Sequence, residues 1–142
     1  MVQEFDGILV VPAPTLEAPE RSAPLTLAED VIFNDLLTTY YSKLVPTKGF
    51  SRFALYLFID STGAPTDIRF QVHFTRAPQE PYYEYRQGPF ASLFYEDADT
   101  ASGLADVFNG DVVGDFLGVR IVATGTTSTL LFQVTVGLQL FK

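Results

Sequence analysis

The chain has 142 residues, of which 47% are hydrophobic, with a formal net charge of −8 and no cysteine. This size fits one domain with a single core, and the missing cysteines exclude a disulfide framework, a thiolate zinc site and a cysteine nucleophile. Nucleic acid and anionic membrane surfaces are poor partners, because both attract clustered Lys and Arg, and the nine basic residues are scattered along this acidic chain.

The N-terminus lacks the features of an export signal. It is acidic at Glu4 and Asp6, and its apolar run, Ile8 to Val11, is short and ends at Pro12. No apolar stretch approaches the ~20 residues of a membrane-spanning helix. We therefore expect a soluble protein that is made in a cytoplasm and not exported.

Residues 1–24 differ in character from the rest of the chain, because four of the nine prolines lie there. Proline fixes φ and removes a donor, so residues 11–24 should be extended and mostly unpaired, while residues 4–11 suit a strand. We interpret the segment as an arm that contacts a neighbouring subunit; an arm wrapped on its own domain and a frayed tail are the alternatives. The candidate partner-binding residues of the arm are Val11, Pro12, Pro14, Leu16, Pro19 and Pro24.

The segment that follows the arm has an ambiguous pattern. Residues 25–27 suit a short strand, and residues 28–37 suit one or two helical turns, because Thr26 and Glu29 have the spacing of a capping box. Residues 36–45 contain a Thr-Thr-Tyr-Tyr run, which favours a strand.

The clearest strand pattern begins at residue 50. Residues 50–60 are apolar on both faces, which predicts a central strand covered on both sides. Residues 66–75 alternate strictly, with Ile68, Phe70, Val72 and Phe74 facing inward. The intervening turn residues favour a hairpin between these two strands.

The rest of the chain adds short elements and two long strands. Short strands are predicted at residues 82–86 and 90–95, and a short helix at residues 101–108. Residues 116–123 and 130–141 then alternate as strands. Seven to nine strands without a long helix or a βαβ rhythm predict an all-β fold. We expect an antiparallel β-sandwich or jelly roll over residues 25–142, preceded by the extended arm of residues 1–24.

No catalytic constellation stands out. His73 is the only histidine, and its outward position on an alternating strand predicts a solvated side chain. No nucleophile-elbow pattern accompanies it, and no pair of carboxylates is singled out for glycoside hydrolysis. We find no phosphate-binding loop, dinucleotide fingerprint or zinc spacing. The sequence therefore predicts a protein that is not an enzyme and that has no cofactor.

Two clusters remain as candidate binding features. Residues 96–115 hold six carboxylates, and residues 97–103 resemble the start of a calcium loop, although the glycine is one position late and no Glu closes the loop. A solvated acidic loop, or one that faces a basic partner, is the default interpretation. Tyr82, Tyr83 and Tyr85 are candidate partner-binding residues, since aromatic side chains anchor interfaces; covering the end of the sandwich is the alternative.

A proline-rich arm, from Val11-Pro12-Ala13-Pro14 to Ala23-Pro24, leads into a compact β domain whose core strands lie in residues 50–75 and 116–141. This architecture resembles that of the capsid decoration, or cement, proteins of tailed bacteriophages, and the resemblance covers most of the chain. It implies an all-β module, often trimeric, that binds the major capsid protein on the outer surface of the virion. Such a protein is made in the host cytoplasm and holds capsomers together.

The amount of apolar surface also predicts self-association. Aromatic side chains and strands that are apolar on both faces exceed what one small sandwich hides, so a homo-oligomer, most simply a trimer, is expected. Two other functions stay open: another phage structural component of the head–tail junction or tail, and a carbohydrate-binding β-sandwich with the tyrosine cluster as its platform. The absence of tryptophan counts against sugar binding.

Overall fold

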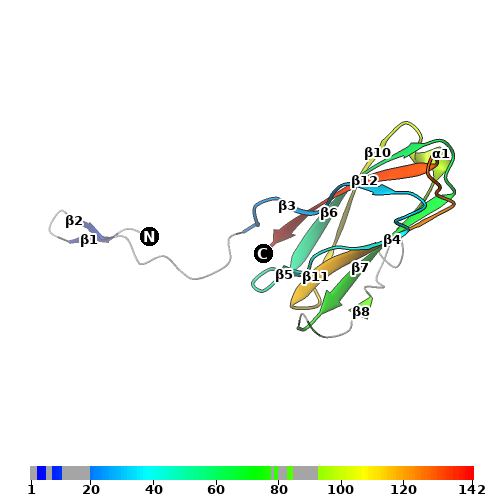
Figure 1. The fold of residues 1–142 in the computed structure, drawn as a ribbon. Coiled ribbons are helices and arrows are strands. Elements are labelled where there is room, and N and C mark those ends of the chain that lie inside the picture. The colour runs from blue at the N-terminus through cyan, green and yellow to red at the C-terminus, as the bar shows by residue number, and fades with distance from the viewer. Residues whose placement is uncertain (1–2, 6–7, 11–19, 78, 80–82, 85–92) are drawn as a thin grey trace.

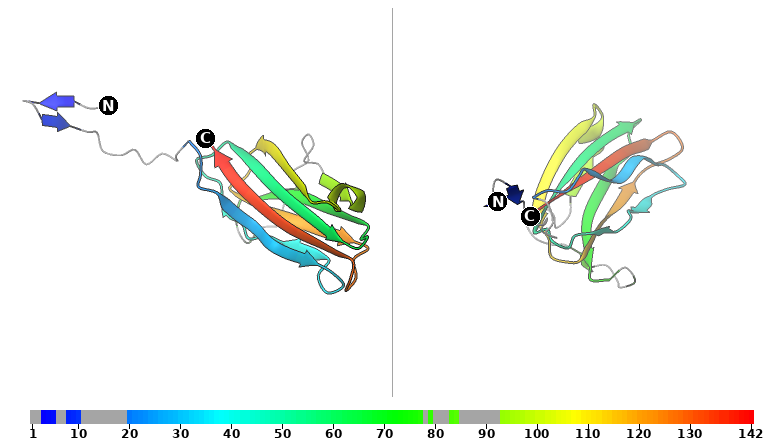
Figure 2. Two further views of the ribbon diagram at one scale, coloured as in Figure 1. Left: turned by 90° about the horizontal axis from the view of Figure 1, so that it is seen from above. Right: turned by 90° about the vertical axis from the view of Figure 1, so that its left-hand side faces the viewer.

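A computed structural model of the protein describes residues 3–5, 8–10, 20–77, 79, 83–84 and 93–142. These residues form an all-β sandwich of two antiparallel sheets (Figures 1 and 2), which confirms the expected fold class. The elements are β1 (Gln3–Phe5), β2 (Ile8–Val10), β3 (Leu25–Phe33), β4 (Thr39–Tyr41), β5 (Val45–Pro46), β6 (Arg52–Thr62), β7 (Asp67–Thr75), β8 (Tyr83–Glu84), β9 (Leu93–Glu96), α1 (Asp97–Thr100), β10 (Leu104–Asp111), β11 (Phe116–Thr124) and β12 (Leu131–Phe141).

The strand order is that of a jelly roll. One sheet has the order β10-β6-β12-β3, and the other has the order β4-β11-β7-β8, in which β5 also pairs with β11 and β9 with β7. The first long strand pairs with the last (β3 with β12), and the strands that follow pair in the same nested way: β4 and β5 with β11, β6 with β10, and β7 with β9. The chain is therefore one long hairpin rolled into two sheets, as in double Greek-key jelly rolls.

The inward faces of the two sheets make the core. The four residues of β7 that were expected to face inward are all buried, as are the alternating apolar residues of β11 and β12. The rings of Phe53 on β6 and Phe74 on β7 meet edge to face, with their centroids 5.9 Å apart. The largest fully buried side chains are Phe33, Phe53, Phe70, Phe132, Leu55, Ile59, Ile68, Leu117, Ile121, Leu138 and Leu140.

Residues 25–33 form a strand and residues 34–36 a bend, so the predicted helical turns are wrong. β3 pairs with β12 along most of its length, with register shifts on either side of Val136. At this irregularity Asp30 has a φ of 47°, and its backbone N–H donates to Thr135 Oγ1 at 3.1 Å. Pairing with β12 brings Leu27 and Phe33 into the core, and this packing outweighs the local capping-box pattern.

The hairpin expected between the first two clear strands is also wrong. β6 lies between β10 and β12 in one sheet, whereas β7 lies next to β11 in the other. The connection between them, residues 63–66, crosses from sheet to sheet. Two strands that pair side by side and two strands that face each other across a core both bury every second side chain. The alternation therefore did not distinguish these two arrangements.

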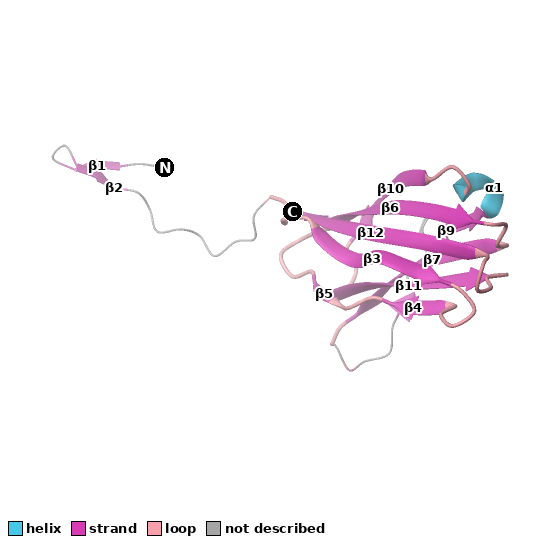
Figure 3. Cartoon of the chain, turned by 45° about the horizontal axis from the view of Figure 1, so that its top comes forward, coloured by secondary structure: helices cyan, strands magenta, loops and turns pink. Residues whose placement is uncertain are grey.

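The predicted helix over residues 101–108 is replaced by a strand and a shorter helix. β10 pairs with β6 from Leu104 to Asp111, and α1 precedes it at one end of the sandwich (Figure 3). The side chain of Asp99 accepts a hydrogen bond from the backbone of Glu96 at 2.9 Å, which caps α1. Within the described ranges, no helix is long and apolar enough to cross a membrane.

The N-terminal strands stand apart from this ladder. In place of the single strand predicted over residues 4–11, β1 and β2 pair with each other as a separate two-stranded sheet.

A tyrosine hydroxyl joins the two sheets along each side of the sandwich. Tyr95 of β9 donates to Asp106 Oδ2 of β10 at 3.1 Å, and its ring meets that of Phe70 edge-on. On the opposite side, Tyr40 of β4 donates to the carbonyl oxygen of Leu27 on β3 at 3.3 Å. Burial, together with the carboxylate of Asp106, raises the pKa of Tyr95 well above its ordinary value of 10.0.

The Tyr95→Phe variant tests the first of these links. It should lower the free energy of unfolding by about 1 kcal/mol at neutral pH, because one hydrogen bond is lost while the ring contact is kept. Folded Tyr95 holds its proton at a pH where the unfolded chain has released it, so its contribution is present below about pH 10 and is lost as the pH rises. The variant should therefore lose less stability than the native chain between about pH 9 and pH 11 in urea titrations. An equal loss in both proteins contradicts this account.

Candidate interaction surface

The outer face of the β10-β6-β12-β3 sheet carries exposed aromatic side chains. Tyr56 and Phe58 of β6 are 45% and 52% exposed, and Val107 of β10 is 48% exposed. β6 is a central strand, as predicted, but Tyr56 and Phe58 on its outer face are about half exposed, which corrects the expectation of burial on both sides. Solvent-facing positions of an antiparallel sheet usually carry polar residues, so this apolar patch is a candidate interaction surface.

Small side chains surround the two rings. Gly137 lies opposite Tyr56, while Ala105 and Thr135 lie on either side of Phe58. Because these neighbours are short, the rings project above them and border a shallow depression of about 540 Å³. We call it the aromatic depression; its lining residues are Tyr56, Leu57, Phe58, Ala105, Asp106, Val107, Thr135 and Gly137.

The depression has the chemistry of a contact surface. Its one carboxylate, Asp106, is held in place, since its oxygens accept hydrogen bonds from the Tyr95 hydroxyl and from the backbone of Val107 at 3.0 Å. The remaining lining offers apolar contact and two hydroxyl groups, those of Tyr56 and Thr135. An apolar centre with a polar rim is the usual anatomy of a protein interface.

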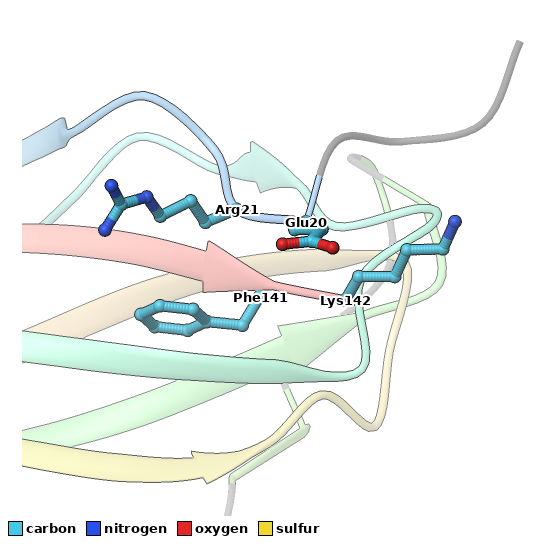
Figure 4. Close-up of a pocket in the computed structure, with 4 residues that line it drawn as sticks. All are labelled: Glu20, Arg21, Phe141 and Lys142. Atoms are coloured by element: carbon cyan, nitrogen blue, oxygen red, sulfur yellow. The ribbon is translucent and has the colours of Figure 1, made fainter. Parts of the chain in front are cut away.

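The arm leaves the sandwich beside the end of β12. Arg21 forms a β-bridge with Phe141, the backbone N–H of Ser22 donates to Leu140 O at 2.8 Å, and that of Lys142 donates to Glu20 O at 2.8 Å. A pocket of about 710 Å³ opens at this corner (Figure 4), lined by Glu20, Arg21, Phe141 and Lys142. Part of the stretch that was expected to be unpaired therefore continues the sheet.

Most of the predicted partner-binding residues lie outside the described residues. These are Val11, Pro12, Pro14, Leu16, Pro19, Tyr82 and Tyr85. Of the other two, Tyr83 pairs with Phe74 through its backbone, and Pro24 is exposed directly before β3. Partner binding by this set stays a prediction.

Sequence reasoning missed Tyr56 and Phe58 as site residues, because it assigned them to a covered face. The number of predicted strands and helices could have identified these residues as exposed. A two-sheet sandwich has no third layer to cover the outer side of a central strand.

His73 is buried, contrary to the expected solvated position. It is 5% exposed and lies opposite Gly118 of β11. A methyl group added at Gly118 would lie 3.3 Å from Ser42 Oγ and 3.2 Å from Leu44 Cδ2. Ser42 and Leu44, in the segment between β4 and β5 that runs alongside β11, therefore lie against Gly118, in the same cross-strand row as His73. Alternation within β7 alone did not reveal these neighbours.

A hydroxyl and a carboxylate do meet, but far from the histidine. Ser61 Oγ donates to Asp97 Oδ1 at 2.8 Å, and the backbone N–H of Asp97 donates to Thr66 O, next to the start of β7. His73 lies six residues further along β7 than Asp67, about 20 Å at ~3.3 Å per residue. These residues do not form a Ser-His-Asp arrangement.

The acidic residues of positions 96–115 serve the fold where their contacts are known. Asp97, Asp99 and Asp106 accept the hydrogen bonds described above. In the described part of the chain, no three His, Cys, Asp or Glu side chains form a group that could hold a metal ion. The calcium interpretation therefore gains no support from these residues.

No family model matches the sequence, and no curated protein matches it. The fold is similar to that of a chain in the solved structure of the infectious bursal disease virus Gx strain, with a TM-score of 0.54 and 8% sequence identity over 99% of this chain. This protein covers 37% of the length of that chain. At such identity the likeness is one of fold alone.

Two truncations test where the arm ends. Removing residues 1–19 should leave the melting temperature nearly unchanged, because the contacts of residues 20–22 with β12 remain. Removing residues 1–24 also deletes three hydrogen bonds of Ser22 with Gln139 and Leu140, which should cost about 2 kcal/mol and several degrees of melting temperature. Differential scanning calorimetry compares the two proteins. Equal melting temperatures would show that residues 20–24 add nothing to the sandwich.

Proposed function

We propose that the protein is a non-enzymatic structural component of a virion, and specifically a capsid decoration or cement protein that stabilises the capsid lattice from its outer surface. The observation that carries the proposal is the jelly-roll strand order, because jelly rolls recur in viral capsid proteins. The likeness of fold to a chain of a virus structure supports it. The protein would be made in the host cytoplasm and added to the capsid.

The proposed partner is the major capsid protein, and two regions would make the contact. The aromatic depression offers an apolar surface on a rigid sheet, where an aromatic anchor contributes most when a partner excludes water. The arm offers reach, because the nine residues 11–19 that join the β1–β2 pair to the sandwich would span up to about 30 Å if extended. A rigid patch and a long arm together would join one subunit to neighbouring capsomers.

Self-association belongs to the same proposal. A second copy could cover the exposed Tyr56, Phe58 and Val107 in subunits where the capsid protein does not. A closed homo-oligomer, most simply a trimer, would satisfy this surface by symmetry.

Two other roles fit the same fold. A head–tail or tail component would use the jelly roll at a different place in the virion. Jelly rolls also occur as lectin domains, so a carbohydrate-binding module is the candidate from another class.

Labelling of virions separates these roles. An antibody against the purified protein should bind particles over the whole capsid, as seen by immunogold electron microscopy. Label confined to the tail or to one vertex would favour the tail or head–tail role. Absence of the protein from gradient-purified particles by mass spectrometry would reject the virion role altogether.

The Phe58→Ser variant tests the aromatic depression. It should weaken self-association or capsid binding at least about tenfold, since buried aromatic anchors contribute about 2 kcal/mol. Stability should fall by about 1 to 2 kcal/mol, which leaves the domain folded, because the side chain is only half buried. Leu36→Ser is the matched control, since Leu36 is 88% exposed and lies outside the depression. Sedimentation velocity and capsid pelleting measure the effect, and equal behaviour of the two variants would exclude the depression as the contact.

A further inference from the structure

The outer face of the β10-β6-β12-β3 sheet changes in chemistry from one end to the other. At the end where the arm leaves, one cross-strand row joins Arg52 of β6, Phe141 of β12 and Arg21 (Figure 4). Both arginines are exposed. The aromatic depression follows at mid-length, on the rows of Tyr56 and Phe58. This face therefore begins with two cations and continues with an apolar surface.

The opposite end of the same face is acidic. Asp60 lies on an outer-face position of β6, and its Oδ1 accepts a hydrogen bond from the backbone N–H of Ser61 at 2.9 Å. Asp30, at the irregularity of β3, accepts hydrogen bonds from Gln133 Nε2 at 3.4 Å and from Thr135 Oγ1 at 3.3 Å. Two carboxylates thus stand at one end of the face, and two guanidinium groups stand at the other.

Tyr56 lies midway between the charged ends of β6. Arg52 and Asp60 are each four residues away from it, which is about 13 Å at ~3.3 Å per residue. Ala54 and Phe58 are each two residues away, on opposite sides. Turning the strand end for end about Tyr56 therefore exchanges a cation with a carboxylate, and a large side chain with a small one.

A second copy turned in this way fits the face. When two sheets pack outer face to outer face about a two-fold axis that crosses β6 at Tyr56, Arg52 lies over Asp60 of the partner subunit, and Phe58 lies over Ala54 of the partner subunit. The two Tyr56 rings meet at the axis, where the neighbouring position on β12 is Gly137 and leaves room for them. With the strands of the two copies in the same direction, like charges would face each other, so the charges select the antiparallel arrangement.

We propose that the free protein forms a two-fold pair through this face. Each pair holds two contacts between Arg52 and Asp60 of the partner subunit, and Arg21 reaches toward Asp30 of the partner subunit. The inference rests on the self-association proposed above, and it gives that association two-fold symmetry in place of the three-fold symmetry expected from the sequence. It describes the free protein, because a capsid protein on the aromatic depression takes the place of the partner subunit.

The paired area sets the strength of the contact. Four strands at about 4.8 Å and the length from Arg52 to Asp60 make a face of about 19 Å by 27 Å. Two copies together therefore bury roughly 1,000 Å², which is the size of a weak, reversible interface. We expect pairs to form at micromolar concentrations of the protein.

Sedimentation equilibrium of the full chain tests the pair. We expect a monomer–dimer equilibrium with a dissociation constant below about 500 μM. Arg52→Glu and Asp60→Arg should each weaken pairing at least about tenfold, because both charge contacts of the pair become contacts between like charges. Lys43→Glu is the matched control. It changes the net charge as Arg52→Glu does, but Lys43 is exposed in the segment that runs along β11 of the other sheet.

An equal mixture of the Arg52→Glu and Asp60→Arg chains gives the sharpest measurement. In a mixed pair the two substituted side chains face each other with opposite charges, and the unchanged Arg52 of one chain faces the unchanged Asp60 of the other. Mixing should therefore restore dimer formation, and native mass spectrometry identifies the mixed pair by its mass. Loss of pairing through misfolding would not be restored by mixing.

The pair is rejected if the native chain is a monomer up to about 500 μM or forms a trimer. It is also rejected if the two charge reversals act no more strongly than Lys43→Glu, or if the mixture stays monomeric. If a charge-reversed chain fails to fold, Gly137→Gln replaces it. A Cβ added at Gly137 would lie 3.6 Å from Tyr56 Cβ, an ordinary contact within the subunit, whereas the longer side chain would fill the space at the axis. This variant should abolish pairing, and unchanged pairing rejects the proposal. None of these outcomes bears on the labelling of virions, so the pair and the virion role fail separately.

Discussion

The pairing of β12 on both of its sides is the constraint on which the rest of the fold depends. Eleven residue pairs join it to β6, and a second ladder joins it to β3. Its inward side chains, from Phe132 to Leu140, lie in the middle of the core. These two ladders place the last strand between two early ones and thereby close the rolled hairpin. The register of β12 against β6 and β3 also sets how the strands of this sheet are aligned. The sandwich cannot form until residues about a hundred positions apart have met, which makes its contacts strongly non-local.

Alternation within strands was enough to predict the fold class and much of the core. It named the inward residues Ile68, Phe70, Val72 and Phe74 of β7 correctly and predicted the alternation of β11 and β12, because a strand with one covered face must bury every second side chain. It failed where the answer lay outside the strand. β3 was read as partly helical because local residues do not show the ladder with β12. His73 was read as solvated because its neighbours in the fold, such as Gly118 of β11, come from distant parts of the chain.

The candidate surfaces were harder to predict for a related reason. Tyr56 and Phe58 read as core because sequence alone does not say how many layers a fold has. Arg69 and Arg120 are 51 positions apart and meet only because β7 and β11 pair. The two outer faces of the sandwich consequently differ in chemistry: one carries the aromatic depression, and the other a hollow lined by arginine, glutamine, valine and threonine side chains.

The hydrogen bond between Lys142 and Glu20 brings the end of β12 next to the base of the arm. A peptide link from residue 142 to residue 20 would turn the jelly roll into a closed ring, and a ring can be opened elsewhere, as circular permutation of compact domains does. If the ring were opened at the connection before β12, the new termini would lie at the other end of that strand, about 35 Å from residues 20 and 142. The end of the sandwich at which the arm leaves is therefore set by the order in which the chain connects the strands. The sandwich itself would accept an arm at either end.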